Sequence, residues 1–309
     1  MAISRKTAVG ARRGTRVRQR WDDTLFDVIA TLILVFAVSI VAYPLVYVVS
    51  ASFSSTTAVM AGRVWLFPVE PSLKAYEAVF TYDSIMTGYL NSAIYTVLGT
   101  AVNLTLTTLC AFCLSRKDFY GRGVVAGMVL FTMLFNAGLI PNYLLINGLG
   151  WLDTTWALII PNAMNAWYVI LMRSYFQNSI PEELFEASGM DGCSVFRQLL
   201  SIVIPLSGPI IAVISLYCAV GIWNSYFDAM IYLNSASKQP LQLVLRSILI
   251  QSQPESGMIA DIQSTAERAK MAELLKYATI IISSLPLLVM YPFFQKYFDA
   301  GIMAGSVKG

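Results

Sequence analysis

Few residues in this 309-residue chain have the types and spacing that catalysis requires. The chain holds no histidine, the residue that most often serves as a general base near neutral pH. Cys110 and Cys113 form a C-x-x-C pair, but they lie inside an apolar stretch, with no histidine to complete a zinc site. No G-x-x-x-x-G-K-[ST] segment is present to hold ATP phosphates. We therefore predict that this chain is not an enzyme, holds no cofactor or metal of its own, and uses its cysteines as small packing residues.

The polar segment with the strongest local signal runs from Asn178 to Pro209. Ser179 followed three residues later by Glu182 matches a capping box, with Pro181 in the first turn, where its missing N–H costs little. Three glutamates near this start, Glu182, Glu183 and Glu186, suit the positive end of a helix dipole. The pattern predicts a short helix on the surface of the protein.

The same helix is predicted to carry an apolar and small-residue face, made of Leu184, Phe185, Ala187 and Ser188. Gly189 and Gly192 can end the helix and turn the chain, and Ser194 can cap a second helix over Val195–Leu200. A short helix of this kind can dock into a groove on a soluble partner and pass the movement of that partner to the helix that follows.

The elements that must position this segment are apolar helices. The chain is 57% hydrophobic and 13% charged, whereas soluble domains carry roughly 25% charged residues. A bilayer core of about 30 Å needs roughly 20 apolar helical residues. Six segments without Asp, Glu, Lys or Arg are of about this length: Val28–Val49, Leu90–Leu114, Gly123–Ile146, Thr154–Met172, Leu200–Trp223 and Tyr277–Phe294. We predict that each is a membrane-spanning helix.

The distribution of basic residues predicts the orientation. Fourteen of the 21 Lys and Arg residues fall in the two tails and in the second and fourth loops, which places both termini in the cytoplasm. The predicted parts are a basic cytoplasmic tail (1–25), a transmembrane domain (26–299) with a cytoplasmic loop (173–199), and a cytoplasmic C-terminal tail (300–309). The predicted outer loops are Ser50–Tyr89, Asn147–Asp153 and Asn224–Lys276.

The cytoplasmic loop resembles a known family. Glu186-Ala187-Ser188, then Gly192, then Ile202-Val203-Ile204-Pro205 follow the pattern E-A-A-x3-G-x9-I-x-L-P of ABC importer permeases, with Ser188 in place of Ala and Ile204 in place of Leu. The pair Asp191-Gly192, the run Trp223–Asp228 and the tail Gly301–Gly309 look like the carbohydrate branch of that family. The likeness covers the chain from about Asp22 onward.

This resemblance implies an all-α, six-helix permease of the type I, maltose-permease-like fold in the cytoplasmic (inner) membrane of a prokaryote. It implies an ATP-driven, binding-protein-dependent importer of oligosaccharides or polysaccharide fragments. The implied partners are a second homologous permease, two ATPase subunits that bind ATP and Mg²⁺, and an extracytoplasmic solute-binding protein, with no role for nucleic acid. The residues implied to contact the ATPases are Glu182, Glu183, Leu184, Phe185, Glu186, Ala187, Ser188, Asp191 and Gly192, and in the tail Gly305, Ser306, Val307, Lys308 and Gly309.

A path for sugar needs amides and hydroxyls for hydrogen bonds and aromatic rings for stacking. Polar residues inside spans usually face the bundle or an aqueous cavity. The candidates in or beside the predicted spans are Asn103, Asn136, Asn165, Tyr168, Trp223, Asn224 and Tyr226. Each has a structural alternative, as a helix cap, an interfacial aromatic anchor or a bond between helices. Asp228, just beyond the fifth span, could be a loop charge, a contact to the binding protein or a sugar ligand.

Three other functions remain open from the sequence. An ion-coupled secondary transporter needs an ion site within the membrane, and the six spans hold no acidic residue. A membrane-embedded enzyme lacks a metal cluster or a nucleophile paired with a base. An ABC permease for a solute other than sugar shares the same loop, so only the carbohydrate-like segments argue against it.

Overall fold

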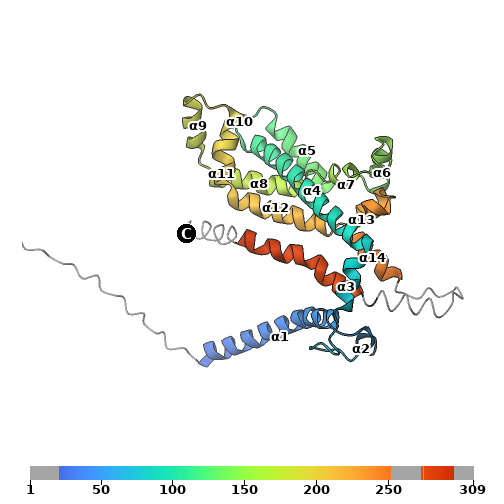
Figure 1. Cartoon of the computed structure of the whole chain (residues 1–309). Helices are drawn as coiled ribbons and strands as arrows, with labels where there is room; N and C mark the ends of the chain where they lie inside the picture. Colours follow the sequence, from blue (N-terminus) through green and yellow to red (C-terminus); the bar gives the residue numbers. More distant parts are fainter. Residues whose placement is uncertain (1–20, 252–272, 274, 296–309) are drawn as a thin grey trace, which may run out of the picture.

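The computed structural model describes residues 21–251, 273 and 275–295, and within those ranges the chain is helical, with no strand (Figure 1). Three helices are long and apolar enough to cross a membrane singly. They are Leu25–Ser52, which is most of α1 (Trp21–Ser52), α4 (Asp83–Ser115) and the last helix, Leu275–Gln295. The prediction of an all-α membrane protein is confirmed.

Two of the predicted spans are bent rather than straight. The third consists of α5 (Arg122–Leu134) and α6 (Leu139–Gly148), which meet at 115°, and Gly138 at the bend has a φ of 87° that favours glycine. The fifth consists of Val195–Leu206 and α12 (Gly208–Trp223), which meet at 84° next to Pro209. Proline removes one helical hydrogen bond and so permits such a bend.

The prediction of a continuous helix over Thr154–Met172 is wrong. The segment contains a short helix α7 (Trp156–Ile159), a break that includes Pro161, and then α8 (Ala166–Ser179). Asn165 begins α8 by accepting a hydrogen bond from the Trp167 N–H at 2.9 Å. The helix α8 continues beyond Met172 through Arg173 to Ser179. Charged and polar side chains are tolerated in this part of the helix because it lies beyond the apolar stretch.

The core of the bundle forms around α4. The main cluster of buried side chains joins α4, α5, α8, α12 and the short helices between α8 and α12; its members include Phe112, Met172, Phe176 and Ile214. By contrast, the apolar side chains of α1 are mostly exposed, as Leu32 at 64% and Phe36 at 68% show. A helix that exposes this much apolar surface is suited to contact lipid or a second membrane protein.

The predicted outer loop Asn224–Lys276 contains helices over residues 227–251, which were not predicted. This part forms α13 (Phe227–Tyr232), the 3-10 turn η2 (Ala236–Lys238) and α14 (Leu241–Gln251). Leu241 is fully buried, and a Cβ at Gly88 of α4 would lie 3.2 Å from the Leu241 backbone. Glycine therefore allows α14 to pack closely on α4.

The predicted loop Ser50–Tyr89 also contains helices, α2 (Thr56–Met60) and α3 (Lys74–Thr81), before α4 begins. In Figure 1 these elements lie with α13 and α14 at one end of α4, whereas α9 (Glu182–Met190) and α10 (Val195–Gln198) lie at the other end. We call these the α14 end and the α9 end.

Candidate functional sites

The helix α9 ends as the sequence predicts but begins differently. The predicted capping box is wrong, because Ser179 is the last residue of α8 and Pro181 occupies the N-cap position without a side-chain hydrogen bond. Gly189 lies inside α9. At the other end the Cys193 N–H donates to the Ser188 carbonyl at 2.9 Å and the Gly192 N–H donates to Gly189 at 3.0 Å. This pair of bonds is a Schellman motif, and it requires the left-handed φ of 72° seen at Gly192.

The Phe185 side chain anchors α9 in the core of the bundle. Phe185 is buried, at 9% exposure, and belongs to the main core cluster. Its ring centroid lies 6.4 Å from that of Phe112, and the Arg116 guanidinium carbon lies 4.4 Å from it, within cation–π range. Lys117 forms an ion pair with Glu182. The side chain of Phe185, one of the predicted ATPase contacts, therefore packs into the helical bundle.

The opposite face of α9 is open to solvent. Glu183, Glu186 and Ala187 are exposed, and Leu184 and Met190 are 40% and 86% exposed. Met190 was not among the predicted contacts; its place on this face could have been found from its spacing of four residues from Glu186. The second helix begins at Ser194 as predicted, since the Ser194 hydroxyl accepts a hydrogen bond from the Arg197 N–H. The predicted contact of Gly305–Gly309 lies outside the described residues.

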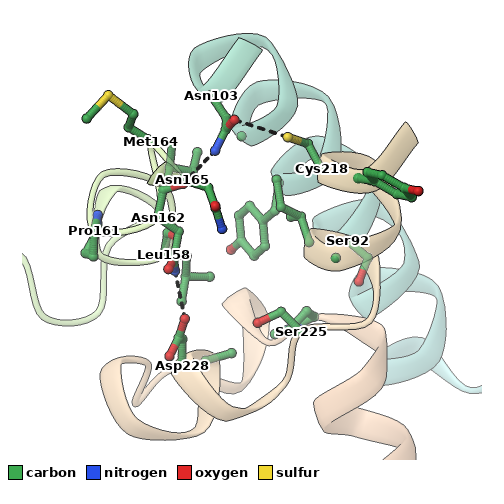
Figure 2. A pocket seen from close by; sticks show the side chains of 18 of the residues that line it. Ser92, Asn103, Leu158, Pro161, Asn162, Met164, Asn165, Cys218, Ser225 and Asp228 are labelled. Atoms are coloured by element: carbon green, nitrogen blue, oxygen red, sulfur yellow. Dashed lines mark hydrogen bonds between the residues drawn. The ribbon is translucent and has the colours of Figure 1, made fainter. Parts of the chain in front are cut away.

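A second candidate site is a cavity of about 280 Å³ between α4, α12, α13 and the break that follows α7 (Figure 2). Three of the predicted path residues, Asn103, Asn165 and Tyr168, line it. The Tyr168 and Tyr217 rings stack with centroids 6.3 Å apart. The wall thus combines amides and aromatic rings, the types of group predicted for a sugar path.

Hydrogen bonds between elements hold the polar wall in place. Asn103 donates to the Asn162 carbonyl at 3.0 Å and accepts from the Cys218 thiol at 3.1 Å. Asn162 in turn donates to the Asp228 carboxylate at 2.8 Å, and both side chains appear in Figure 2 on facing segments. Among the described residues that line the cavity, Asp228 is the one charged side chain.

The other four predicted path residues do not line this cavity. Trp223 is buried, and its indole N–H donates to the Ser283 carbonyl. Asn224 donates to Val220 as a helix cap, and Tyr226 lies under the Arg246 guanidinium. Asn136 accepts from the Gly138 N–H in the bend between α5 and α6.

Several lining residues were missed. On α4 they are Ser92, Tyr95 and Gly99, which precede Asn103 at spacings of three, four and four. That spacing places small and polar residues on one face of a helix, and it could have revealed the cavity wall from sequence. Ser225 and Tyr217 were missed as well.

At the α14 end, a set of bonds to Asp153, which we call the clasp, joins two segments of the chain. The Asp153 carboxylate accepts hydrogen bonds from the Ser235 hydroxyl at 2.6 Å and from the Asn234 and Ser235 N–H groups at 3.0 Å each. It also pairs with the Lys238 ammonium at 2.9 Å. These bonds, above all those from Ser235, hold the pKa of Asp153 well below its ordinary value. The clasp ties the loop before α7 to the segment between α13 and α14.

Comparison with known proteins gives consistent results. Residues 7–304 match the family described as binding-protein-dependent transport system inner membrane component. The polygalacturonan/rhamnogalacturonan transport system permease protein YtcP of Bacillus subtilis is 42% identical, over 93% of this chain and 99% of its own length. The protein LplC of the same organism is 40% identical over 92% of this chain and 95% of its own length.

A solved structure shares the fold. It is described as a bacterial ABC transporter involved in the import of the acidic polysaccharide alginate. Its matching chain is 35% identical to this one, with a TM-score of 0.82, over 90% of this chain and 98% of that chain.

Proposed function

Because this chain belongs to the family of binding-protein-dependent transport system inner membrane components, we propose that it is a permease subunit that imports oligosaccharides or polysaccharide fragments with energy from ATP. The family membership and the likeness to the alginate importer chain support the permease role. The Bacillus subtilis relative named for polygalacturonan and rhamnogalacturonan, and the importer of the acidic polysaccharide alginate, support fragments of acidic polysaccharides as the first substrates to test.

The proposed complex contains this chain, a second homologous permease, two ATPase subunits and an extracytoplasmic solute-binding protein. ATP and Mg²⁺ bind to the ATPase subunits. The distribution of basic residues supports a cytoplasmic position for both termini and for the α9 end, and in this orientation the α14 end faces the binding protein. The exposed apolar surface of α1 is available to the membrane or to the second permease.

The observation that carries this proposal is the two-sided construction of α9. Its outer face, with Leu184, Glu186, Ala187 and Met190, is free to dock on an ATPase subunit, while Phe185 is buried in the same core as α12. Movement of the ATPase can therefore reach α12, which lines the cavity through Tyr217 and Cys218. The bundle alternates between two states, and the closed ATPase dimer must fit one of them better if it is to drive the change.

The proposed path for sugar is the cavity beside Asn165, Tyr168 and Asp228. Hydroxyl groups of the sugar can bond to the amides and the carboxylate, and a ring face can stack on the Tyr168–Tyr217 pair. ATP is hydrolysed on the partner ATPase subunits and not on this chain. This chain converts the docking of those subunits into a change in the side of the membrane to which the cavity opens.

The test is uptake into proteoliposomes that contain the full complex, with tetragalacturonate as an acidic probe and maltotetraose as a neutral one. We expect uptake of at least one probe only when ATP, the ATPase subunits and the binding protein are all present. Uptake by this chain alone, driven by a sodium or proton gradient, would instead identify an ion-coupled transporter.

A further inference from the structure

A buried glutamine joins α9 to the helix that follows it. Gln198, at the end of α10, is 4% exposed. Its amide nitrogen donates to the Phe185 carbonyl at 3.2 Å and to the Ser188 hydroxyl at 2.9 Å. Ser188 itself donates to the Phe185 carbonyl at 3.0 Å, so the three groups form one closed set of bonds. Because a carbonyl can only accept, this arrangement fixes which end of the Gln198 amide faces α9.

The set of bonds spans the turn at Gly192. It joins α9 and α10 across the backbone between Met190 and Val195, where Gly192 adopts a conformation that most residues avoid. A polar link that is buried is stronger than the same link in water, since the surrounding groups screen it less. Gln198 therefore holds the angle between α9 and α10.

The helix that carries Gln198 leads directly to the cavity. After Gln198 the chain forms the π-helix η1 (Leu199–Val203) and α11 (Ile204–Leu206), and then bends by 84° into α12. Leu199 and Val203 are buried in the same cluster as Phe185. π-helical turns often occur at functional positions, where they allow a local shift of a helix. A movement of α9 that reaches Gln198 can thus pass along α10, η1 and α11 to α12, which lines the cavity. We call this stretch, Val195–Trp223, the α10–α12 arm.

We infer that Gln198 is a positioning residue for transport: by bonding to Phe185 and Ser188 it makes α9 and the α10–α12 arm move together. The inference rests on the proposed function. It also explains why Ser188 stands where the permease pattern has Ala, because the serine hydroxyl is one of the two acceptors for the Gln198 amide.

The experiment uses the reconstituted complex and compares three variants. Q198A removes both donated bonds. The double variant S188A/Q198L removes both polar side chains together and replaces their link by apolar contact, while the Phe185 carbonyl remains a backbone acceptor within α9; removing both partners in this way is nearly neutral in many proteins. Q177A is the matched control, because Gln177 is an exposed glutamine at the same end of the bundle whose amide donates to the Ser115 carbonyl of α4 at 3.3 Å. The readouts are tetragalacturonate imported per ATP hydrolysed, co-purification of the ATPase subunits and the melting temperature.

We expect Q198A to retain the ATPase subunits and to lower the sugar imported per ATP about fivefold, the scale of one or two hydrogen bonds. The double variant should recover most of this loss, and Q177A should match the unmodified protein. Full coupling in Q198A overturns the inference, as does a loss that follows the melting temperature and is not recovered in the double variant. If the unmodified complex shows no ATP-dependent uptake, the proposed function fails as well.

Discussion

The Asn162 amide donates a hydrogen bond of 2.8 Å to the Asp228 carboxylate, across 66 positions of sequence. Asn162 lies in the break between α7 and α8, and Asp228 lies in the first turn of α13. The bond therefore joins the break after α7 to the start of α13 at the wall of the cavity. The bond fixes the orientation of both side chains along the proposed path for sugar.

Asp228→Asn should weaken the capture of sugar while leaving the energy coupling intact. The change keeps the shape of the side chain but replaces a charged hydrogen-bond acceptor, and hydrogen bonds to charged groups are worth about 1.5–3 kcal/mol. We expect the KM for uptake to rise about tenfold, with an unchanged basal rate of ATP hydrolysis. Initial rates of uptake over a range of probe concentrations measure this, with Asp83→Asn at the exposed start of α4 as control. An unchanged KM would remove Asp228 from the sugar path.

Glu186→Lys should disconnect transport from ATP hydrolysis. Glu186 is exposed on the outer face of α9, so the change alters the docking surface and not the core. Reversal of one charge in a complementary interface can cost several kcal/mol. We expect normal amounts of the protein in the membrane, uptake lowered at least about tenfold, and no stimulation of ATP hydrolysis by the loaded binding protein. Normal uptake together with normal stimulation would show that Glu186 lies outside the interface.

Gly192→Val should have a similar effect for a different reason. Nothing lies within 4 Å of a Cβ built at Gly192, so the cost comes from the backbone φ of 72° and not from a clash. A β-branched residue is strongly disfavoured in that conformation. We expect α9 to lose its Schellman ending and the complex to lose most of its uptake. The control is Gly189→Ala, at a helical position with equally open space, which should retain activity.

Asp153→Asn should change how stability depends on pH. The folded-state pKa of Asp153 is lowered, first by the Ser235 bonds and then by Lys238. The carboxylate therefore stabilises the folded protein fully above the ordinary pKa of 3.8, and this stabilisation is lost as the pH falls further toward the folded-state value. The backbone φ of Asp153 is 55°, a left-handed conformation that Asn also tolerates, so the change to Asn removes the charge without straining the backbone.

Melting temperatures of the detergent-purified protein between pH 7 and pH 3 test this prediction. Asp153→Asn should melt below the unmodified protein at neutral pH, and the difference should shrink below about pH 4. Glu77→Gln, on the exposed face of α3, is the matched control. A difference that stays constant over the whole range would contradict the role of the charge.

The apolar segments were predictable because a helix in lipid must be long and free of charge. The breaks were not, since Pro161 and Gly138 are as compatible with a kinked helix as with a broken one until their neighbours are placed. The start of α4 at Asp83 was missed because the predicted span, Leu90–Leu114, was limited to residues without charge. A helix can extend beyond the membrane into water, where a charged residue no longer argues against it.

The candidate sites were predicted unevenly. Gly192 and Ser194 could be assigned because capping depends on a few neighbouring residues. The burial of Phe185 could not, because its neighbours Phe112 and Arg116 lie far away in sequence. Asn103, Asn165 and Tyr168 were identified as polar residues within spans, but the same reasoning also selected Trp223 and Asn136, whose polar groups bond to nearby backbone instead.

The most direct test of the account is photo-crosslinking from Ala187, an exposed residue on the outer face of α9. A photoreactive amino acid placed there in the intact complex should form a covalent product with an ATPase subunit. The same amino acid at Trp65, an exposed residue at the α14 end, should form none. A product between position 187 and the binding protein, or labelling of position 187 by a membrane-impermeant reagent added outside intact cells, would contradict the account.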